Sequence, residues 1–187
     1  MCCVIILKVG DYMKYKVTRK QFNSDECFVC GIHNHSGLKT AFYELENGVV
    51  VTITKGDNFH QSYPNRMHGG IISALLDETI GRAINITEPE TWGVTIKLEV
   101  SYRKPVPLDE EIIVCGWITK SKGMTFKGEG VILSKDKKTV LATSEGTYFK
   151  QNIHDIIGEH RLSGWQFVED LHAVTEIDID YEFTRSE

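Results

Sequence analysis

Two short β-prone runs stand out in the first third of the chain, over 39–45 and 49–55. They flank Asn47-Gly48, a dipeptide that favours a tight hairpin turn because both residues tolerate positive φ. A segment rich in turn-forming residues follows over 56–67. The pattern therefore predicts a β-hairpin and then a long loop.

The hydrophobic period changes after this loop. Between Gly70 and Ile86 apolar residues recur at spacings of three and four, and no proline interrupts them. This is the period of an α-helix, and the apolar arc is too wide for a helix that lies on a surface. The sequence predicts a buried helix over 70–86, which ends at Glu88-Pro89.

Alternation of period two marks the strands that follow, and it is clearest over 94–103. It places the apolar residues on one face and the polar residues on the other: Val94, Ile96, Leu98, Val100 and Tyr102 against Thr95, Lys97, Glu99, Ser101 and Arg103. Further strands are predicted over 111–119, 124–134 and 139–150. The connections are too short for crossover helices, so the sheet is expected to be antiparallel.

The predicted order is two strands, one buried helix and four strands. An isolated apolar helix must be covered, and a curved antiparallel sheet can cover it. We therefore predict an α+β hotdog fold, in which an antiparallel sheet is wrapped around one long central helix; another α+β sandwich with the same element order is the alternative. The expected organisation is an N-terminal extension over 1–26, the hotdog domain over 27–150 and an acidic appendix over 151–187.

Charge and cysteine content narrow the class of protein. The net charge of −5 argues against binding of nucleic acid. Residues 151–187 carry a net charge of −7, so the first 150 residues are close to neutral. Five cysteines, two of them adjacent, make a poor disulfide framework, and the apolar start is too short to span a membrane. With no secretory signal, these features indicate a cytoplasmic protein.

The two ends of the chain allow fewer conclusions. Residues 1–12 are interpreted either as an extension ahead of Met13 or as an edge strand. Near the other end, Trp165, Phe167 and Val168 are apolar within an acidic segment. We expect that part of this appendix to dock on the body of the domain.

Candidate chemistry begins at His68-Gly69-Gly70, where the loop enters the predicted helix. The first amides of a helix have no partner within it and lie at the positive end of its dipole, so they can hold an anion or a developing oxyanion. Glycine lets another group approach closely. The alternative is a tight turn that needs glycine for steric reasons alone.

Asp77 lies among apolar neighbours within the same helix, where an isolated carboxylate is costly to bury. Glu78, next to it, is interpreted as the exposed acid of the helix. Seven residues separate Asp77 from Gly70, which is about 10 Å along a helix. A base and an oxyanion donor must both reach one reacting carbon. The spacing therefore indicates a site that two copies of the chain share.

Three blocks of the chain, in order, resemble motifs of the PaaI-type hotdog acyl-CoA thioesterase family. The blocks are Cys27-Phe-Val-Cys30-Gly31 with Asn34 and Gly37-Leu38, then His60 through His68-Gly69-Gly70 to Asp77-Glu78, and Gly93-Val94-Thr95 through Tyr102-Arg103-Lys104-Pro105. Together they cover about 120 residues. A Gly-x-Ser-x-Gly motif is missing, which excludes an α/β-hydrolase type of thioesterase.

The resemblance implies hydrolysis of an acyl-CoA thioester to a carboxylate and free CoA, without a cofactor or metal, by a homodimer or homotetramer. In such a site Asp77 is the general base or the nucleophile. The Gly70 amide, backed by Gly69, polarises the thioester carbonyl, and His68 shapes the loop. Thr95 orients the attacking water, or else is an ordinary strand threonine.

Further residues are candidates for substrate binding. The resemblance implies that the Gln61 amide helps to hold the carbonyl, although its spacing is irregular, and that Arg103 and Lys104 meet phosphates of CoA. Glu78 belongs to the same candidate set because of its place beside Asp77. Two rival functions stay open: a non-catalytic acyl-CoA binder or sensor, and a hotdog hydratase, which lacks its usual aspartate–histidine arrangement here.

Cys27 and Cys30, with His33 and His35 close behind, offer four groups that could bind zinc. The spacing between the second cysteine and the first histidine is too short for a standard zinc finger. We therefore expect the two cysteines to pack the N-terminal turn against the sheet.

Overall fold

The computed structural model describes residues 13–157 and 164–183. Within them, eight strands form one antiparallel sheet in the order β10-β1-β3-β4-β6-β7-β8-β5. The bounds are β1 (Met13–Lys20), β3 (Tyr43–Leu45), β4 (Val49–Thr54), β5 (Thr91–Tyr102), β6 (Ile112–Lys122), β7 (Thr125–Leu133), β8 (Val140–Asn152) and β10 (Glu176–Ile179). A separate pair joins β2 (Asn23–Ser24) to β9 (Trp165–Gln166). The expectations for residues 1–12 lie outside the described residues.

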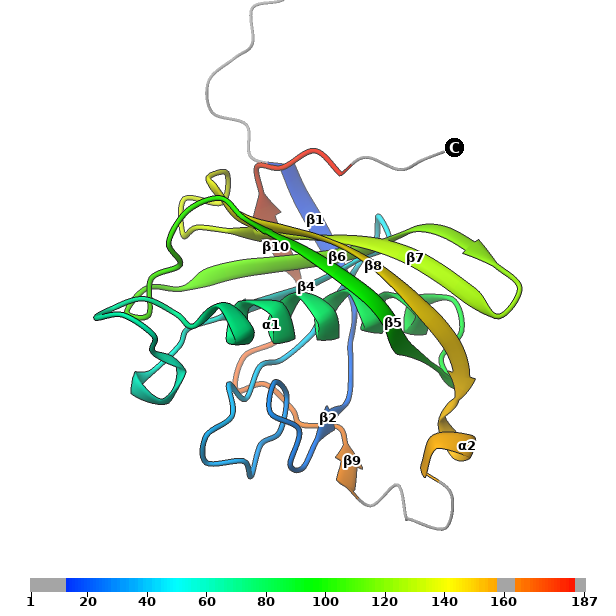
Figure 1. The fold of residues 1–187 in the computed structure, drawn as a ribbon. Helices are drawn as coiled ribbons and strands as arrows, with labels where there is room; N and C mark the ends of the chain where they lie inside the picture. Colours follow the sequence, from blue (N-terminus) through cyan, green and yellow to red (C-terminus); the bar gives the residue numbers. More distant parts are fainter. Residues whose placement is uncertain (1–12, 158–163, 184–187) are drawn as a thin grey trace, which may run out of the picture.

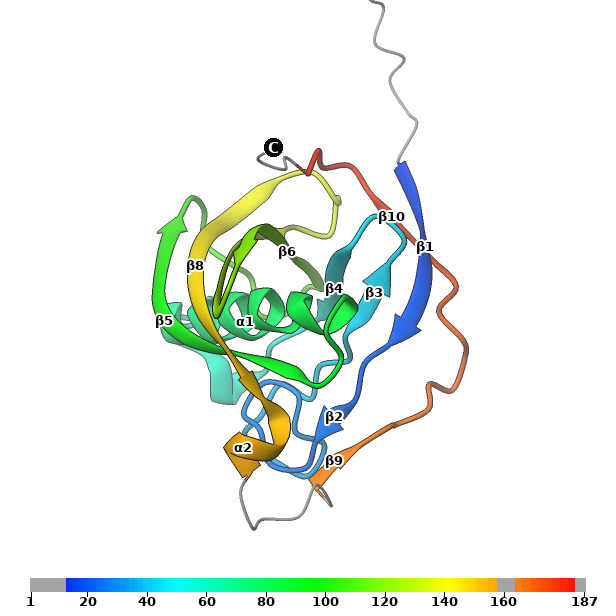
Figure 2. The same ribbon diagram turned by 90° about the vertical axis from the view of Figure 1, so that its right-hand side faces the viewer.

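The helix α1 (Gly69–Gly81) lies in the concave side of the curved sheet (Figures 1 and 2). Its buried side chains include Leu75, Leu76 and Ile80. The prediction of a buried helix is confirmed, but the last five residues, Arg82–Ile86, form a 3₁₀ helix, η2. Two further short helices are η1 (Asn58–His60) and α2 (Ile153–Ile157).

The predicted hairpin is also confirmed, because β3 pairs with β4 and Gly48 has a φ of 75° at the turn. Its first strand is shorter than predicted and begins at Tyr43. The residues before it bond elsewhere: Lys39 has a φ of 53°, and the Thr40 amide donates to the Val29 carbonyl at 3.0 Å. Bonds to the preceding loop therefore replace the expected sheet pairing.

Strand β5 departs from the strict alternation of apolar and polar residues that was predicted for it. Its register with β8 shifts between Thr95 and Lys97, so Ile96 is an extra residue, a β-bulge. A bulge moves the following side chains to the opposite face. Thr95 consequently faces α1, together with Leu98 and Val100, which pack in the core. Ile96, expected on the core face, is 60% exposed.

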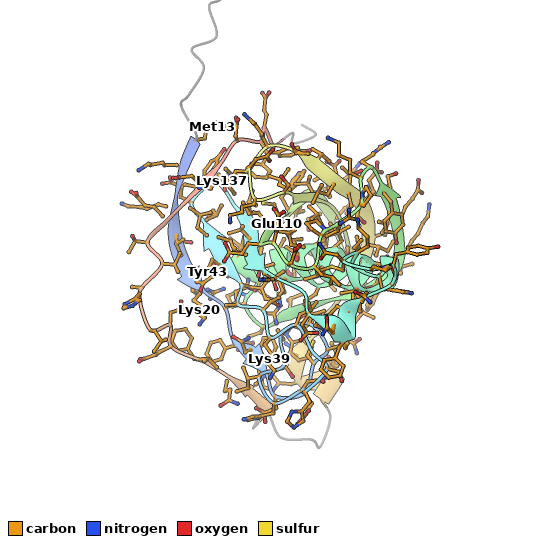
Figure 3. All side chains as sticks on the ribbon, turned by 90° about the vertical axis from the view of Figure 1, so that its left-hand side faces the viewer. Met13, Lys20, Lys39, Tyr43, Glu110 and Lys137 are labelled. Atoms are coloured by element: carbon orange, nitrogen blue, oxygen red, sulfur yellow. The ribbon has the colours of Figure 1, made fainter. Side chains whose placement is uncertain are left out.

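The C-terminal segment returns to the sheet and covers its outer face. Strand β10 pairs with β1, and Phe183 packs against Trp117 with ring centroids 5.1 Å apart. Asp170 binds both Lys20 and Tyr43, which lie close together near the end of β1 (Figure 3). The expected docking of the appendix on the body of the domain is confirmed at Trp165, whose ring contacts Trp92 and lies over the Arg82 guanidinium.

Three glycines of β6 and β7 lie directly beneath α1: Gly116, Gly128 and Gly130. A Cβ atom on Gly116 would come within 2.8 Å of the backbone of Thr79 and Ile80, and one on Gly128 within 2.5 Å of the Ile80 side chain. Only glycine allows so close an approach between a helix and a sheet. These three residues, the glycine patch, set the position of the helix.

We expect Gly116→Ala to destabilise the protein by about 1–3 kcal/mol or more, because the methyl group would meet helix backbone that cannot yield easily. Thermal unfolding by circular dichroism measures the effect. Gly81→Ala is the matched control, since its Cβ would lie 3.5 Å from the Tyr148 ring, an ordinary contact. Equal stability of the two variants would show that the glycine patch does not position α1.

Candidate functional site

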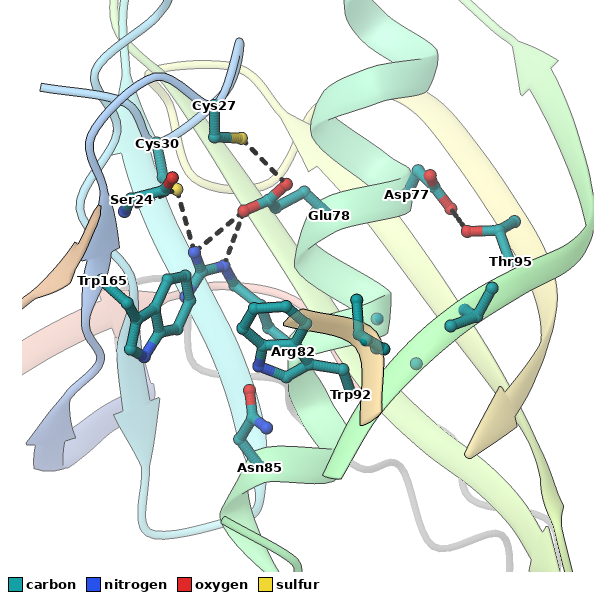
Figure 4. A pocket seen from close by; sticks show the side chains of 14 residues that line it. Ser24, Cys27, Cys30, Asp77, Glu78, Arg82, Asn85, Trp92, Thr95 and Trp165 are labelled. Carbon is teal, nitrogen blue, oxygen red and sulfur yellow. Dashed lines mark hydrogen bonds and ion pairs between the residues drawn. The ribbon is translucent and has the colours of Figure 1, made fainter. Parts of the chain in front are cut away.

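A pocket of about 390 Å³ lies beside the second half of α1 (Figure 4). Segments from across the chain form its wall: Ser24, Cys27, Cys30, Asp77, Glu78, Gly81, Arg82, Asn85, Trp92, Gly93, Val94, Thr95, Ile156 and Trp165. Trp92 and Trp165 close one side with ring centroids 5.2 Å apart. The pocket is therefore mostly apolar, with a few polar groups held on the helix.

Asp77 reaches this pocket from α1, and two hydroxyl groups bind it. The Oγ1 of Thr95 donates to its Oδ1 at 2.8 Å, and the Oη of Tyr148 donates to the same oxygen at 3.2 Å. Both bonds fall on one carboxylate oxygen. The two bonds hold the carboxylate in one orientation, and neither of them involves its second oxygen, Oδ2.

Burial raises the pKa of Asp77 above its ordinary value, and the negative charge of Glu78 adds to this. The bonds from Thr95 and Tyr148 lower the pKa of Asp77, but by less than burial raises it. Burial next to this carboxylate also raises the pKa of Tyr148, so the phenol keeps its proton and acts as a donor. A carboxylate made more basic in this way suits proton abstraction near neutral pH.

Tyr148 was not among the residues predicted for the site. It lies opposite Thr95 in the pairing of β5 with β8, and its ring stacks on Phe126 with centroids 4.9 Å apart. Nothing in the local pattern of β8 distinguishes this tyrosine from a core residue. The signal is the strand register, which pairs Tyr148 with Thr95.

The start of α1 forms a second polar centre. His68 caps the helix, since its Nδ1 accepts a hydrogen bond from the Gly70 amide at 2.9 Å. The Gly69 carbonyl accepts from Tyr102 Oη at 2.9 Å and from Ser73 Oγ at 3.1 Å. His68 therefore caps the helix, and its own ring occupies the amide that was predicted to hold the carbonyl.

A single chain does not bring these two centres together. Asp77 and Thr95 line the pocket, whereas His68, Gly69 and Gly70 do not. Seven helical residues place Gly70 about 10 Å from Asp77 along the axis.

The remaining candidates lie apart from Asp77. Gln61 is exposed, and its Oε1 accepts from the Asn65 amide at 3.1 Å. Arg103 and Lys104 are exposed just after β5, which is the end of that strand nearest the helix start. Arg103 also lines a shallow hollow on the outer face, beside several glutamates.

Glu78 is not the exposed acid that was expected. Its side chain is 24% exposed and forms an ion pair with Arg82, with Oε1 2.9 Å from Nη2. Its other oxygen accepts from Cys27 Sγ at 3.4 Å. Both cysteines therefore contact α1 and η2, since Arg82 also donates to Cys30 Sγ at 3.0 Å, and both belong to a core cluster that includes sheet residues. Within the described ranges, Cys27, Cys30 and Glu78 form a cluster that could hold a metal ion, with ligand atoms within 4.8 Å of one another.

Comparison with known proteins agrees with this geometry. The thioesterase superfamily matches residues 65–141, which include the helix start, Asp77 and Thr95. Residues 65–141 belong to the thioesterase superfamily. The acyl-coenzyme A thioesterase THEM4 of mouse is 29% identical to this chain over 133 residues, which are 70% of this chain and 56% of the relative. The chain thus spans about half the length of the first curated relatives it matches.

Two solved structures confirm the predicted hotdog fold of this chain. The E. coli PaaI protein is 14% identical with a TM-score of 0.55, over 62% of this chain and 81% of that one. A hypothetical thioesterase from Streptococcus pneumoniae, solved with coenzyme A, is 22% identical with a TM-score of 0.55, over 70% of this chain and 98% of that one. Among the described residues, none of the helices is long and apolar enough to cross a membrane.

We expect Thr95→Val to raise the pKa of Asp77 further, because the variant loses the bond that stabilises the ionised carboxylate. Tyr148→Phe should raise it by less, since this bond contributes less and the ring stack is kept. Carbon-13 NMR titration of the aspartate carboxyl groups measures both effects. Asp136, whose pKa is lowered by bonds from Thr139, is the internal control. A pKa of Asp77 that stays constant or falls in Thr95→Val would contradict the assigned contacts.

Proposed function

We propose that this chain hydrolyses an acyl-CoA thioester to a carboxylate and free CoA, with Asp77 as general base or nucleophile. The observation that carries the proposal is the half-buried Asp77 carboxylate, oriented by Thr95 and Tyr148 at the wall of an apolar pocket. In the base mechanism, Asp77 takes a proton from a water that attacks the thioester carbon, and Thr95 helps to place that water. In the nucleophile mechanism, the carboxylate itself attacks this carbon.

The start of α1 would supply the second half of the site. Its amides lie at the positive end of the helix dipole, where an oxyanion is stabilised. The Gly70 amide is bonded to His68 Nδ1, so an incoming carbonyl has to displace the exposed His68 ring. His68 would therefore occupy the Gly70 amide in the free protein and move aside when the substrate binds.

A second copy of the chain would bring the two halves together. Strand β5 is the long edge of the sheet, paired on one side with β8. Its exposed residues include Val94 at 42% and Ile96 at 60%, next to Thr95. An apolar unpaired edge is a ready surface for association. Twofold pairing there would place Gly70 of one copy opposite Asp77 of the other.

The CoA part of the substrate would lie along this junction. The Streptococcus pneumoniae relative with the same fold was solved with coenzyme A. Lys104 is exposed near the helix start and is free to meet a phosphate, whereas Arg103 lies beside glutamates. We assign the phosphate contact to Lys104 first.

Asp77→Asn should abolish turnover and leave the fold intact, because the amide has nearly the same shape but cannot accept the proton or attack. A base contributes roughly 10²–10⁴-fold, so the rate should fall by more than two decades. Its pKa is raised in the folded protein, so ionised Asp77 reduces stability at neutral pH, and Asn should raise the melting temperature. Release of free CoA from a panel of acyl-CoAs, followed with a thiol reagent, measures the rate.

Glu78→Gln is the matched control, one residue along the helix but about 100° around it. It should cost far less activity than Asp77→Asn. If both variants lose activity equally, the assignment within this pair of acids is wrong. If Asp77→Asn keeps full activity, the mechanism fails, and if wild type binds acyl-CoA without releasing CoA, the protein is a binder.

Mixing two inactive variants tests the shared site. Gly70→Pro removes the proposed amide donor at a position where the first helical turn tolerates proline. Asp77→Asn removes the base. When the two are co-expressed, half of randomly formed dimers are mixed, and each of these has one intact site, so about a quarter of wild-type activity should return. If each site lies within one chain, every site stays defective and no activity returns.

A further inference from the structure

Cys27 and Cys30 form a close pair of sulfur atoms outside the proposed catalytic chemistry. Their sulfur atoms lie within 4.8 Å of each other. The chain turns tightly between them, because the Gly31 amide donates to the Cys27 carbonyl at 2.8 Å. A Cβ on Gly31 would come within 2.2 Å of that same carbonyl oxygen, so only glycine fits. The backbone thus holds the two cysteines in the compact arrangement that a disulfide requires.

The two cysteines are chemically unequal. Both cysteines line the pocket, but Cys27 is half-buried whereas Cys30 is fully buried. A hydrogen bond from the Cys30 thiol lowers the pKa of Cys27 to about 7, against the opposing effects of burial and Glu78. The same bond and burial raise the pKa of Cys30. One sulfur is therefore an accessible thiolate near neutral pH, and the other is a protected thiol.

The surrounding charges favour sulfur chemistry over a bound metal. The Arg82 guanidinium donates to Cys30 Sγ at 3.0 Å and to Glu78 Oε1 at 2.9 Å. It is held in place by bonds to Gln21 and to the Phe22 carbonyl. The guanidinium is a permanent positive charge, and it already binds two of the three groups that a metal ion would need as ligands. The same charge stabilises a transient Cys30 thiolate.

We propose that Cys27 and Cys30 are a reversible dithiol–disulfide pair in the wall of the Asp77 pocket. The Cys27 thiolate attacks one sulfur of a small-molecule disulfide, and the other half leaves as a thiolate. Cys30 passes its proton to that thiolate, and its sulfur displaces the bound half from Cys27. The chain gains one disulfide, and the small-molecule disulfide is reduced to two thiols.

Oxidation changes the pocket wall next to Asp77. The Cys27 thiol no longer donates to Glu78 Oε2, and Cys30 Sγ becomes a weaker acceptor for Arg82. Glu78 directly follows Asp77 on α1. A change in the redox state of the cysteines therefore changes contacts of α1, the helix that carries the proposed base.

The sequence permits a direct test, because trypsin releases both cysteines in one peptide, 21–39, and the buried Cys115 in another, 104–120. The full chain is equilibrated in mixtures of glutathione and glutathione disulfide, alkylated and digested, and the peptides are measured by mass spectrometry. We expect peptide 21–39 to lose both alkyl groups under oxidising mixtures and to regain them with reductant. Cys115 should not form a mixed disulfide.

Two variants separate the roles of the sulfurs. Cys30→Ser should accumulate a glutathione adduct on Cys27, since the resolving thiol is gone. Cys27→Ser should leave Cys30 without an adduct, since that sulfur is buried and protonated.

Three results would overturn the proposal. Peptide 21–39 could stay fully alkylated in every mixture, or both variants could take up glutathione equally. Purified protein could instead carry one equivalent of zinc that Cys27→Ser releases, which would make the cluster a metal site. None of these readouts depends on thioesterase activity, so they stand apart from the test of Asp77.

Discussion

The close contact between α1 and the sheet is the constraint on which the rest of the structure depends. At Gly116 the helix backbone comes so near to β6 that even a methyl group would overlap it. Interiors packed to this density leave a helix little freedom to slide or rotate. The contact therefore decides which α1 residues enter the core and which face β5. It therefore also fixes the side of α1 on which Asp77 lies, toward Thr95 of β5.

Two neighbouring acids on this helix consequently meet opposite environments. Glu78 turns toward Arg82 and is compensated by a full positive charge 2.9 Å away. Asp77 turns toward Thr95 and Tyr148, which offer hydroxyl dipoles and no cation. A dipole compensates a buried charge less completely than an ion does. The first acid is thus stabilised and structural, while the second stays poised to gain a proton.

Those features that depend on local pattern were predictable from the sequence. The hairpin at Gly48, the buried helix and the acid at Asp77 each follow from spacing over a few residues. The features that were missed arise from pairing between distant segments. The bulge at Ile96 is visible only against β8, and the direct pairing of Thr95 with Tyr148 places both hydroxyl groups beside the same carboxylate. The Arg82 contact with Cys30 likewise joins residues 52 positions apart.

The two edges of the described sheet are unlike each other. The outer strand β10 has only four residues, and its acids Glu176 and Asp178 form ion pairs with Lys14 and Lys137. Strand β5 at the opposite edge has twelve residues and exposes Val94 and Ile96. Open-ended growth of a sheet needs two edges that can pair, and the short β10 edge offers little backbone for pairing. Unequal edges of this kind favour a closed pair about a twofold axis over fibres.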